Sequence, residues 1–201
     1  MRIETQHDVA GNVIQDATNK YLYDAEGQVC ATQNLLVGTM TGYIYDAEGT
    51  RVSKGTISAW TCDIKSNGFQ PVSDYIIGPG GEQLTETGSD GQGNMVWSHT
   101  NVFAAGSLIG TYDKDGLHFY LNDWLGNRRV QTDYAGVFEE SCTNLPFGDS
   151  LNCLTAPGYF ATPNTPTEHH FTGKERDVET GNDYFGARYY ASSTGRFLTP
   201  D

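Results

Sequence analysis

The sequence has little of what marks membrane or nucleic-acid-binding proteins. It contains no run of 18 apolar residues, so we expect no membrane-spanning helix. Only 12 lysine and arginine residues stand against 25 aspartate and glutamate residues, which gives a formal net charge of −13. Such a charge repels phosphate backbones, and we expect no nucleic-acid partner. The first residues, MRIETQHDVAGN, lack the apolar stretch of a secretory signal, so we expect no export signal in this chain.

Metal-ligand patterns are scarce as well. The cysteines Cys30, Cys62, Cys142 and Cys153 form no C-x-x-C pair, which argues against a zinc or thioredoxin-like site. His169 and His170 are adjacent, so on a strand they point to opposite faces and cannot chelate one ion together. We therefore expect no metal and no cofactor. We expect the cysteines to be free buried thiols, and the alternative is a bridge between Cys142 and Cys153 that closes a loop.

Helical periodicity and catalytic signatures are also missing. No window of a dozen residues holds apolar groups at helical spacing without a glycine or a turn cluster, and the best place for one helical turn is TEHHFTGKERDVETG at 167–181. The stretch AAGSLIG at 104–110 is not a nucleophile elbow, and no phosphate-binding glycine loop occurs. We therefore do not expect an enzyme. Glycine, in contrast, is abundant, at 24 of 201 residues.

The glycines recur in a repeated phrase. YLYDAEGQVC at 21–30 and YIYDAEGTRV at 43–52 share their tyrosines, aspartate and glycine. In D-A-E-G the aspartate suits the first position of a type I turn, where its carboxylate accepts a backbone N–H, and glycine suits a position with positive φ. A type I turn followed by a left-handed glycine makes a hairpin loop with a G1 bulge, so each phrase predicts a chain reversal.

The same spacing continues along the chain. D-x-x-G recurs at 113–116, 123–126 and 133–136, and S-S-T-G stands at 192–195. The segments that follow the three middle copies, 117–122, 127–132 and 137–142, have the usual length of a strand. This spacing predicts a β-meander. The glycine run at 86–94 predicts a wide hairpin tip, and 62–71 and 155–168 predict long loops.

The sequence therefore predicts an all-β fold, built as antiparallel hairpins in one large twisted sheet. Tyrosine alternation in YLYD and YIYD predicts aromatic ladders, in which Tyr21, Tyr23, Tyr43 and Tyr45 stack across neighbouring strands. We divide the chain into residues 1–100 and 101–201 and expect the two parts to form one continuous unit. The aspartates come one per turn, too sparse for a calcium site, so we expect them to stabilise turns.

These motifs resemble a known family. Y-x-Y-D-x-x-G followed by an apolar strand resembles the YD repeat of bacterial Rhs proteins, toxin-complex B and C components and animal teneurins. FYLNDWLGNRRVQTDYAGVF at 119–138, PFGD at 146–149 and the last 31 residues are similar to the Rhs repeat-associated core segment. Leu121, Trp124 and Ala191 depart from the family pattern, which usually has aspartate at the last position.

Particular residues carry this resemblance. They are the four tyrosines named above, the turn residues Asp24, Gly27, Asp46, Gly49, Asp123, Gly126, Asp133 and Gly136, and, toward the C-terminus, Gly173, Lys174, Asp177, Gly181, Arg188, Tyr189, Gly195, Arg196 and Phe197. Arg188 is expected to stack on neighbouring tyrosine rings and to bond to a buried carboxylate. Lys174 and Asp177 are expected to form a local ion pair or to stabilise a turn.

The resemblance implies a β-sheet that spirals into a hollow shell around a C-terminal payload, in a parent protein that is secreted or lies at the cell surface. The chain would be a structural part of that shell, and its partners would be the rest of the shell and the payload. Open sheet edges predict an edge-strand homodimer or an N-terminal segment that covers the edge.

Two other functions remain open. In several family members the core segment is an aspartic autoprotease that releases the payload, for which Asp201 is a weak candidate, since such a site needs two carboxylates and the motif supplies one. The teneurin likeness suggests a cell-surface adhesion or glycan-binding module.

Overall fold

The computed structural model describes residues 5–157 and 169–200 of the chain and contains two antiparallel sheets. The larger sheet has 14 strands and the smaller has four, and in both the strands follow one another in sequence order. The large sheet comprises β1 Gln6–His7, β2 Val13–Gln15, β3 Asn19–Tyr23, β4 Val29–Asn34, β5 Met40–Tyr45, β6 Arg51–Thr56, β7 Gln70–Ile77, β8 Gln83–Ser89, β9 Met95–Ala104, β10 Ser107–Asp113, β11 Gly116–Asn122, β12 Arg128–Asp133, β13 Phe138–Thr143 and β14 Asn152–Thr155. The small sheet comprises β15 Glu175–Arg176, β16 Asp183–Tyr184, β17 Tyr189–Ala191 and β18 Arg196–Phe197.

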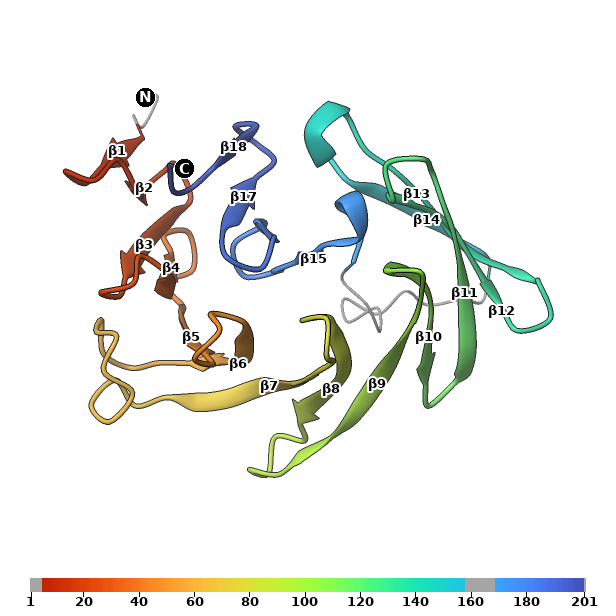
Figure 1. The fold of residues 1–201 in the computed structure, drawn as a ribbon, viewed down its shortest axis with the longest axis horizontal. Helices are drawn as coiled ribbons and strands as arrows, with labels where there is room; N and C mark the ends of the chain where they lie inside the picture. The colour runs from red at the N-terminus through yellow and green to blue at the C-terminus, as the bar shows by residue number, and fades with distance from the viewer. Residues whose placement is uncertain (1–4, 158–168, 201) are drawn as a thin grey trace.

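The large sheet bends into an arc, and the small sheet lies inside it (Figure 1). Strong twist is the ordinary behaviour of a long antiparallel sheet, and here it accumulates over 14 strands. The small sheet also meets the first strands directly, because the backbone N–H of Val13 donates to the carbonyl of Leu198 at 2.7 Å. The all-β meander predicted from the sequence is therefore confirmed. The sheet continues without a break through residue 100, which lies within β9.

Aspartate and glycine form the corners as predicted. At the first repeat, Gly27 N–H donates to the carbonyl of Asp24, and the N–H groups of Glu26 and Gln28 donate to Oδ1 of the same aspartate at 2.9 Å. Gly27 has a φ of +80°, in the left-handed region that glycine adopts without a Cβ penalty. The pairing shifts register between Leu22 and Tyr23, which is the expected bulge.

The corner geometry repeats elsewhere. Oδ1 of Asp46, Asp123 and Asp133 each accepts the same two backbone N–H groups, from residues i+2 and i+4. Two further corners with this pattern, at Asp8 and Asp90, were not recognised from the sequence as copies of the phrase. The predicted turn at 113–116 differs, because Asp113 pairs directly with Gly116 and closes a two-residue loop.

The other local predictions have mixed outcomes. The hairpin at 86–94 is confirmed by the pairing of β8 with β9, and one 3₁₀ turn, Phe171–Gly173, lies where a helical turn was expected. A second turn, Pro146–Gly148, was not predicted. The loop predicted at 62–71 ends earlier, because β7 begins at Gln70. Most of the loop predicted at 155–168, residues 158–168, lies outside the described residues. Neither described helix is long and apolar enough to cross a membrane.

The prediction of free thiols is wrong. Cys30 is bonded to Cys62, and Cys142 to Cys153, with Cα–Cα distances of 5.4 and 4.1 Å. The alternative Cys142–Cys153 bridge is confirmed: the two residues lie opposite each other in the pairing of β13 with β14. The Cys30–Cys62 bridge joins a strand to a loop 32 residues later, and sequence spacing alone could not have revealed that proximity.

We predict that the corner glycines stabilise the fold through their backbone conformation. Gly27→Ala should lower the free energy of unfolding by about 1–2 kcal/mol, because alanine in the left-handed region is strained although nothing lies within 4 Å of an added Cβ. Urea denaturation of the disulfide-bonded protein measures the change. Gly88→Ala, in β8 with ordinary φ and similar space, is the matched control and should change stability little. Equal effects of the two substitutions would contradict the corner assignment.

Candidate functional site

The candidate site is a network of buried charges between the two sheets. We define the inter-sheet network as Arg51 and Lys54 of β6 together with Glu175, Asp177 and Glu179 of the C-terminal segment. Arg51 is completely buried, and its Nη2 lies 2.7 Å from Glu175 Oε2, while its Nη1 lies 2.7 Å from Asp177 Oδ2. We call residues 169–200 the inner segment and the 14-stranded sheet the wall. Two carboxylates of the inner segment are therefore bound by one guanidinium of the wall.

Lys54 adds a second cation to the network. Its Nζ lies 3.3 Å from Glu175 Oε1, 3.4 Å from Asp177 Oδ1 and 3.8 Å from Glu179 Oε2. A charge removed from water is tolerated only when it is paired and hydrogen-bonded. The shared contacts meet that condition for Arg51, Lys54, Glu175 and Asp177, all of which are buried.

Tyrosine rings surround the Arg51 guanidinium. Its central carbon lies 4.4 Å from the ring centroid of Tyr184, 5.1 Å from that of Tyr75 and 5.4 Å from that of Tyr43. These distances allow cation–π attraction, which is stronger in a desolvated site. The hydroxyls also take part: Arg51 Nη1 donates to Tyr189 at 2.9 Å, and Tyr75 donates to Glu175 at 2.8 Å. The arginine is thus held by tyrosine rings of both sheets and by carboxylates of the C-terminal segment.

The tyrosines of the repeated phrase face this inner segment. Tyr21 and Tyr43 are buried in one cluster with Tyr184, Tyr189 and Leu198, and Tyr23 and Tyr45 pack against it. The ring of Tyr43 lies 5.5 Å from that of Tyr189. These four tyrosines of the repeated phrase therefore pack on the small sheet, in place of the expected ladder along the large one. Strand β4 separates β3 from β5, which explains the difference.

The second tyrosine of each phrase has a separate role. Tyr23 donates its hydroxyl to the carbonyl of Val13, and Tyr45 donates to the carbonyl of Val29, each at 2.7 Å. Both acceptors lie in an earlier part of the large sheet, so each tyrosine spans from its own strand to the strand before it in the arc.

Burial shifts the acidity of the carboxyl groups around the network. Burial raises the pKa of Glu175, but the charges of Arg51 and Lys54 outweigh it and leave that pKa well below its ordinary value. Burial raises the pKa of Asp177 to about 6, and the pKa of nearby Glu86 in β8 to about 7. Three carboxylates of the network stand against two cations, so the surplus negative charge disfavours ionisation of a further, half-buried acid such as Glu86.

A second arginine, Arg128 of β12, connects the wall to the same inner segment further along the sheet. Its backbone N–H donates to the carbonyl of His170 at 3.1 Å, and its Nη2 lies 3.0 Å from Glu140 Oε1 and 3.0 Å from a ring nitrogen of His170. Its guanidinium carbon lies 5.1 Å from the ring centroid of Tyr120. Each of the two arginines thus contacts a carboxylate, an aromatic ring and the C-terminal segment.

Sequence reasoning missed both arginines, although a signal was present. Each occupies the last position of D-x-x-G-x-R, at 46–51 and at 123–128. The G1 bulge of the corner fixes the register, so the sixth residue of the phrase points to the concave face in both copies. In the corners at Asp24 and Asp133 the corresponding residues are Val29 and Phe138, which are apolar.

One pairing expected from the sequence is wrong, and another is confirmed in part. Asp177 pairs with Arg51 and Lys54 of the wall, and the exposed Lys174 instead lies 5.8 Å from the ring centroid of Phe185. Arg188 does stack on a ring, but it is that of Phe197, at 4.1 Å. The turn residues Gly181 and Gly195 have positive φ, and Arg196 is exposed on β18. Asp201 lies outside the described residues.

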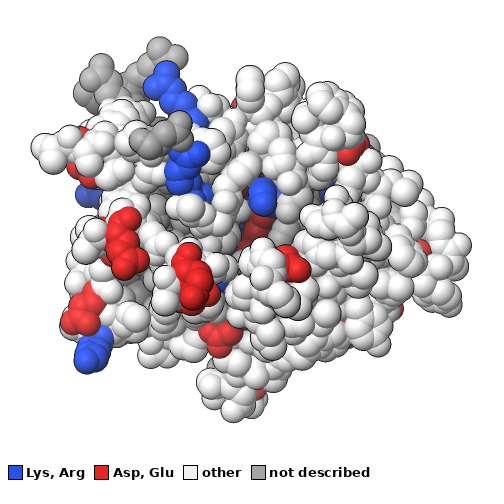
Figure 2. Space-filling model, viewed as in Figure 1, with Lys and Arg blue, Asp and Glu red and all other residues white. Residues whose placement is uncertain are grey.

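A cleft of about 890 Å³ lies beside the network. Its lining combines the corners of several hairpins with the inner segment, and includes Glu48, Glu82, Trp124, His169 and Glu175. On the face shown in Figure 2, acidic and basic side chains form small separate groups over a largely uncharged surface. That face carries no extended patch of one sign of the kind that binds nucleic acid.

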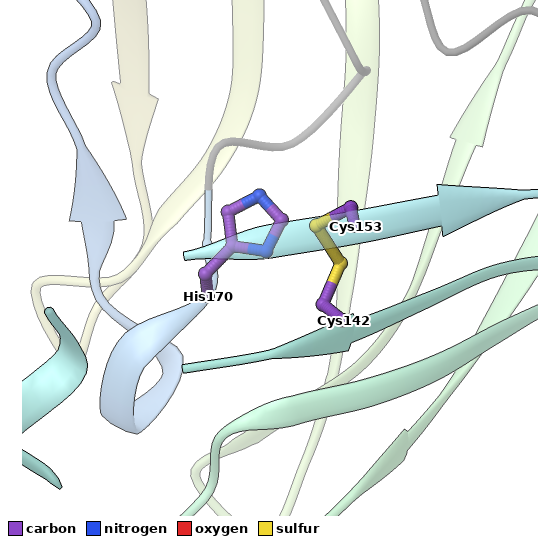
Figure 3. A group of neighbouring side chains, drawn as sticks. All are labelled: Cys142, Cys153 and His170. Atoms are coloured by element: carbon purple, nitrogen blue, oxygen red, sulfur yellow. A yellow bond between two sulfur atoms is a disulfide. The ribbon is translucent and has the colours of Figure 1, made fainter. Parts of the chain in front are cut away.

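The histidine and cysteine placements define one further cluster. His170 lies next to the Cys142–Cys153 disulfide, as Figure 3 shows, and one ligand atom of each residue lies within 4.8 Å of the others. Burial, and then the charge of Arg128, hold the pKa of His170 well below its ordinary value, so its imidazole is neutral.

Comparison with known proteins shows a similarity of fold to solved structures, without a match in sequence. No family model and no curated protein sequence matches this chain. The crystal structure of TcdB2-TccC3 superposes with a TM-score of 0.71 at 18% identity, covering 97% of this chain and 10% of that one. The fold is related to that of Tc toxin chains. TcdB2-TccC3-Cdc42 gives 0.69 at 17% identity, and a Photorhabdus luminescens Tc holotoxin pore gives 0.67 at 18%, each over 97% of this chain and 9% of the other. The chain therefore spans about a tenth of the length of these toxin-complex chains.

We predict that Arg51 contributes more to stability than any exposed cation of the chain. Arg51→Met should lower the free energy of unfolding by about 3–5 kcal/mol, because it removes the nearer of the two cations that pair with the buried Glu175 and Asp177. Chemical denaturation followed by tyrosine fluorescence measures the loss. The control Arg196→Met, at an exposed position, should cost less than about 0.5 kcal/mol. A loss below 1 kcal/mol for Arg51→Met would contradict the assignment.

We predict a pH dependence that Glu86 causes. Burial and the negative charge of Glu175 raise the pKa of Glu86 to about 7, so its contribution to stability is complete below about pH 4.5 and is lost as the pH rises through 7. The stability of Glu86→Gln relative to the wild type should therefore rise between pH 5 and 8. The rise should be on the order of 2 kcal/mol, which is less than the full pKa shift implies, because the side chain is partly exposed to solvent.

Denaturation at several pH values measures this difference. Glu26→Gln, in the first corner, is the control and should give no such trend. A difference between Glu86→Gln and the wild type that stays constant from pH 5 to 8 would show that Glu86 does not titrate in this range.

Proposed function

We propose that this chain is a wall segment of an Rhs/YD-repeat β-shell, and that its C-terminal sheet plugs the shell around a C-terminal payload of a longer parent protein. The observation that carries this proposal is the position of the small sheet inside the arc, where Arg51 binds two of its carboxylates (Figure 1). A sheet that only needed a hydrophobic core would not require buried ions at this interface, because well-packed apolar residues stabilise at least as well.

The concave face supports an enclosing role. It meets the inner segment through tyrosines and charges at several points along the arc, from Tyr21 in β3 to Arg128 in β12. Asn19 and Asn34 add hydrogen bonds from their side chains to the carbonyls of Thr180 and Glu179. A segment bound in this distributed way stays inside the arc even when single contacts open.

We propose a structural role and not an enzymatic one. Two buried carboxylates of the inner segment, Glu175 and Asp177, are paired with Arg51 and Lys54 and so hold the two sheets together. An aspartic protease instead needs two carboxylates that share a proton and activate a water.

The disulfides support a location outside the cytoplasm for the parent protein. Two disulfides in one small chain are typical of proteins that reside in an oxidising environment. We propose on this basis that the parent is secreted or displayed at the cell surface.

The free edge of the large sheet suggests where the parent shell continues. Strand β14 is the last of the large sheet, and among the described residues no other strand pairs with its outer edge. We propose that the next strand of the shell pairs there in the parent protein. In the isolated chain, the same edge would support the predicted homodimer.

The enclosure proposal is tested by protease protection in the chain extended with its natural downstream sequence. The downstream segment should resist a nonspecific protease in the wild type. In Arg51→Met it should be cut at least about tenfold faster, because the plug opens more often. The exposed-site variant Arg196→Met should retain the protection. Rapid cutting of the downstream segment in the wild type, at the rate of an unfolded control peptide, would overturn the proposal.

A further inference from the structure

The cluster around the Cys142–Cys153 disulfide contains more than two cysteines. The two cysteines lie opposite each other on β13 and β14, and the buried His170 approaches them from the inner segment (Figure 3). One ligand atom from each of these three residues lies within 4.8 Å of the others. The carboxylate of Glu140 lies beside this group, with its Oε1 3.2 Å from the sulfur of Cys142. Two sulfurs and an imidazole therefore lie close together, and a carboxylate lies next to one of the sulfurs.

This set of donors matches the preferences of one class of metal ion. Zinc binds cysteine thiolates, neutral histidine and carboxylate in tetrahedral sites, with ligands arranged around a single ion. Sulfurs joined in a disulfide are poor ligands, because the thiolate is the form that binds metals. Among the described residues, this is the one group of three or more potential metal-ligating side chains with such spacing.

We propose that the reduced form of this protein binds one zinc-class divalent ion through Cys142, Cys153, His170 and Glu140. The same four residues would thus form a disulfide in an oxidising environment and a metal site in a reducing one.

Reduction of the disulfide precedes metal binding. A dithiol reductant transfers two electrons and two protons to the S–S bond, which breaks to give two cysteine thiols, and the reductant becomes a disulfide. Binding of the divalent ion then displaces both thiol protons to solvent and forms two metal–sulfur bonds. Cys153 is only half-buried, so a small reductant can reach the sulfur pair from its side.

The surroundings compensate the charge of such a site. Two thiolates and one carboxylate around a divalent ion carry a net charge of −1, and the neutral imidazole adds none. Arg128 supplies the balancing positive charge, since its Nη2 lies 3.0 Å from Glu140. The ion would take the imidazole lone pair that now faces Arg128, and Arg128 would keep its contact with Glu140.

The other disulfide provides the internal control. The pair Cys30 and Cys62 belongs to no such group of ligands among the described residues. The test therefore uses the Cys30→Ser/Cys62→Ser variant, which keeps only the proposed site. It is reduced with a dithiol under anaerobic conditions, the reductant is removed, and Co²⁺ is added as a spectroscopic probe.

We expect one equivalent of Co²⁺ to bind, with sulfur-to-cobalt charge-transfer absorption and the visible bands of a tetrahedral ion, and Zn²⁺ should displace it. The oxidised protein should give neither signal. If the reduced protein is unfolded without metal, Co²⁺ should restore its β-sheet circular dichroism together with these bands. Absence of the bands in the reduced protein, or identical bands in the oxidised protein, would overturn the proposal.

Substitutions then assign the ligands. In the same background, Cys153→Ser should abolish most of the charge-transfer absorption, and His170→Gln should weaken Co²⁺ binding by at least about tenfold. Ser141→Ala, the neighbour of Cys142 in β13, is the matched control and should bind as the parent variant does. Full-strength bands in Cys153→Ser would show that the metal lies elsewhere and would overturn the assignment.

Discussion

One buried arginine holds the two parts of this structure together. Arg51 lies at the first position of a wall strand. Its guanidinium meets two carboxylates of the inner segment and tyrosine rings of both sheets. Removing such a charge from water is costly unless its partners are in place, so the folded state requires the inner segment to occupy one particular position. The small sheet, with strands of two or three residues, has little core of its own to fix its place.

The aspartate-glycine corners explain how the arginine reaches that position. In a strand, a shift of one residue would turn every side chain to the opposite face. The corner sets the register of the strand that follows it, because its aspartate binds two backbone N–H groups and its glycine permits the bulge. The phrase D-x-x-G-x-R then places an arginine on the concave face at Arg51 and again at Arg128. The turn residues, repeated along the chain, thus determine where arginine side chains of the wall contact the inner segment.

The sequence predicted the local parts of this architecture well and the long-range parts poorly. Corners, hairpins and the all-β class follow from nearby residues such as Asp24 and Gly27, so they could be read directly. Asp177 was assigned a local partner, Lys174, because a sequence shows only neighbours, whereas its true partner Arg51 lies 126 residues earlier. The Cys30–Cys62 bridge and the packing of Tyr43 on Tyr189 were missed for the same reason. Each depends on how the large sheet curves round the small one, and curvature accumulates over many strands.

The central claim is that Arg51 holds the inner sheet in place against the wall, beyond adding to overall stability. Amide hydrogen exchange of native wild-type protein and of Arg51→Met, resolved by segment, tests it most directly. The account predicts a much larger acceleration of exchange in β15–β18 of the variant than in β8 and β9, because the inner sheet opens more often than the wall unfolds. Unchanged exchange in β15–β18, or equal acceleration in every strand, would contradict it.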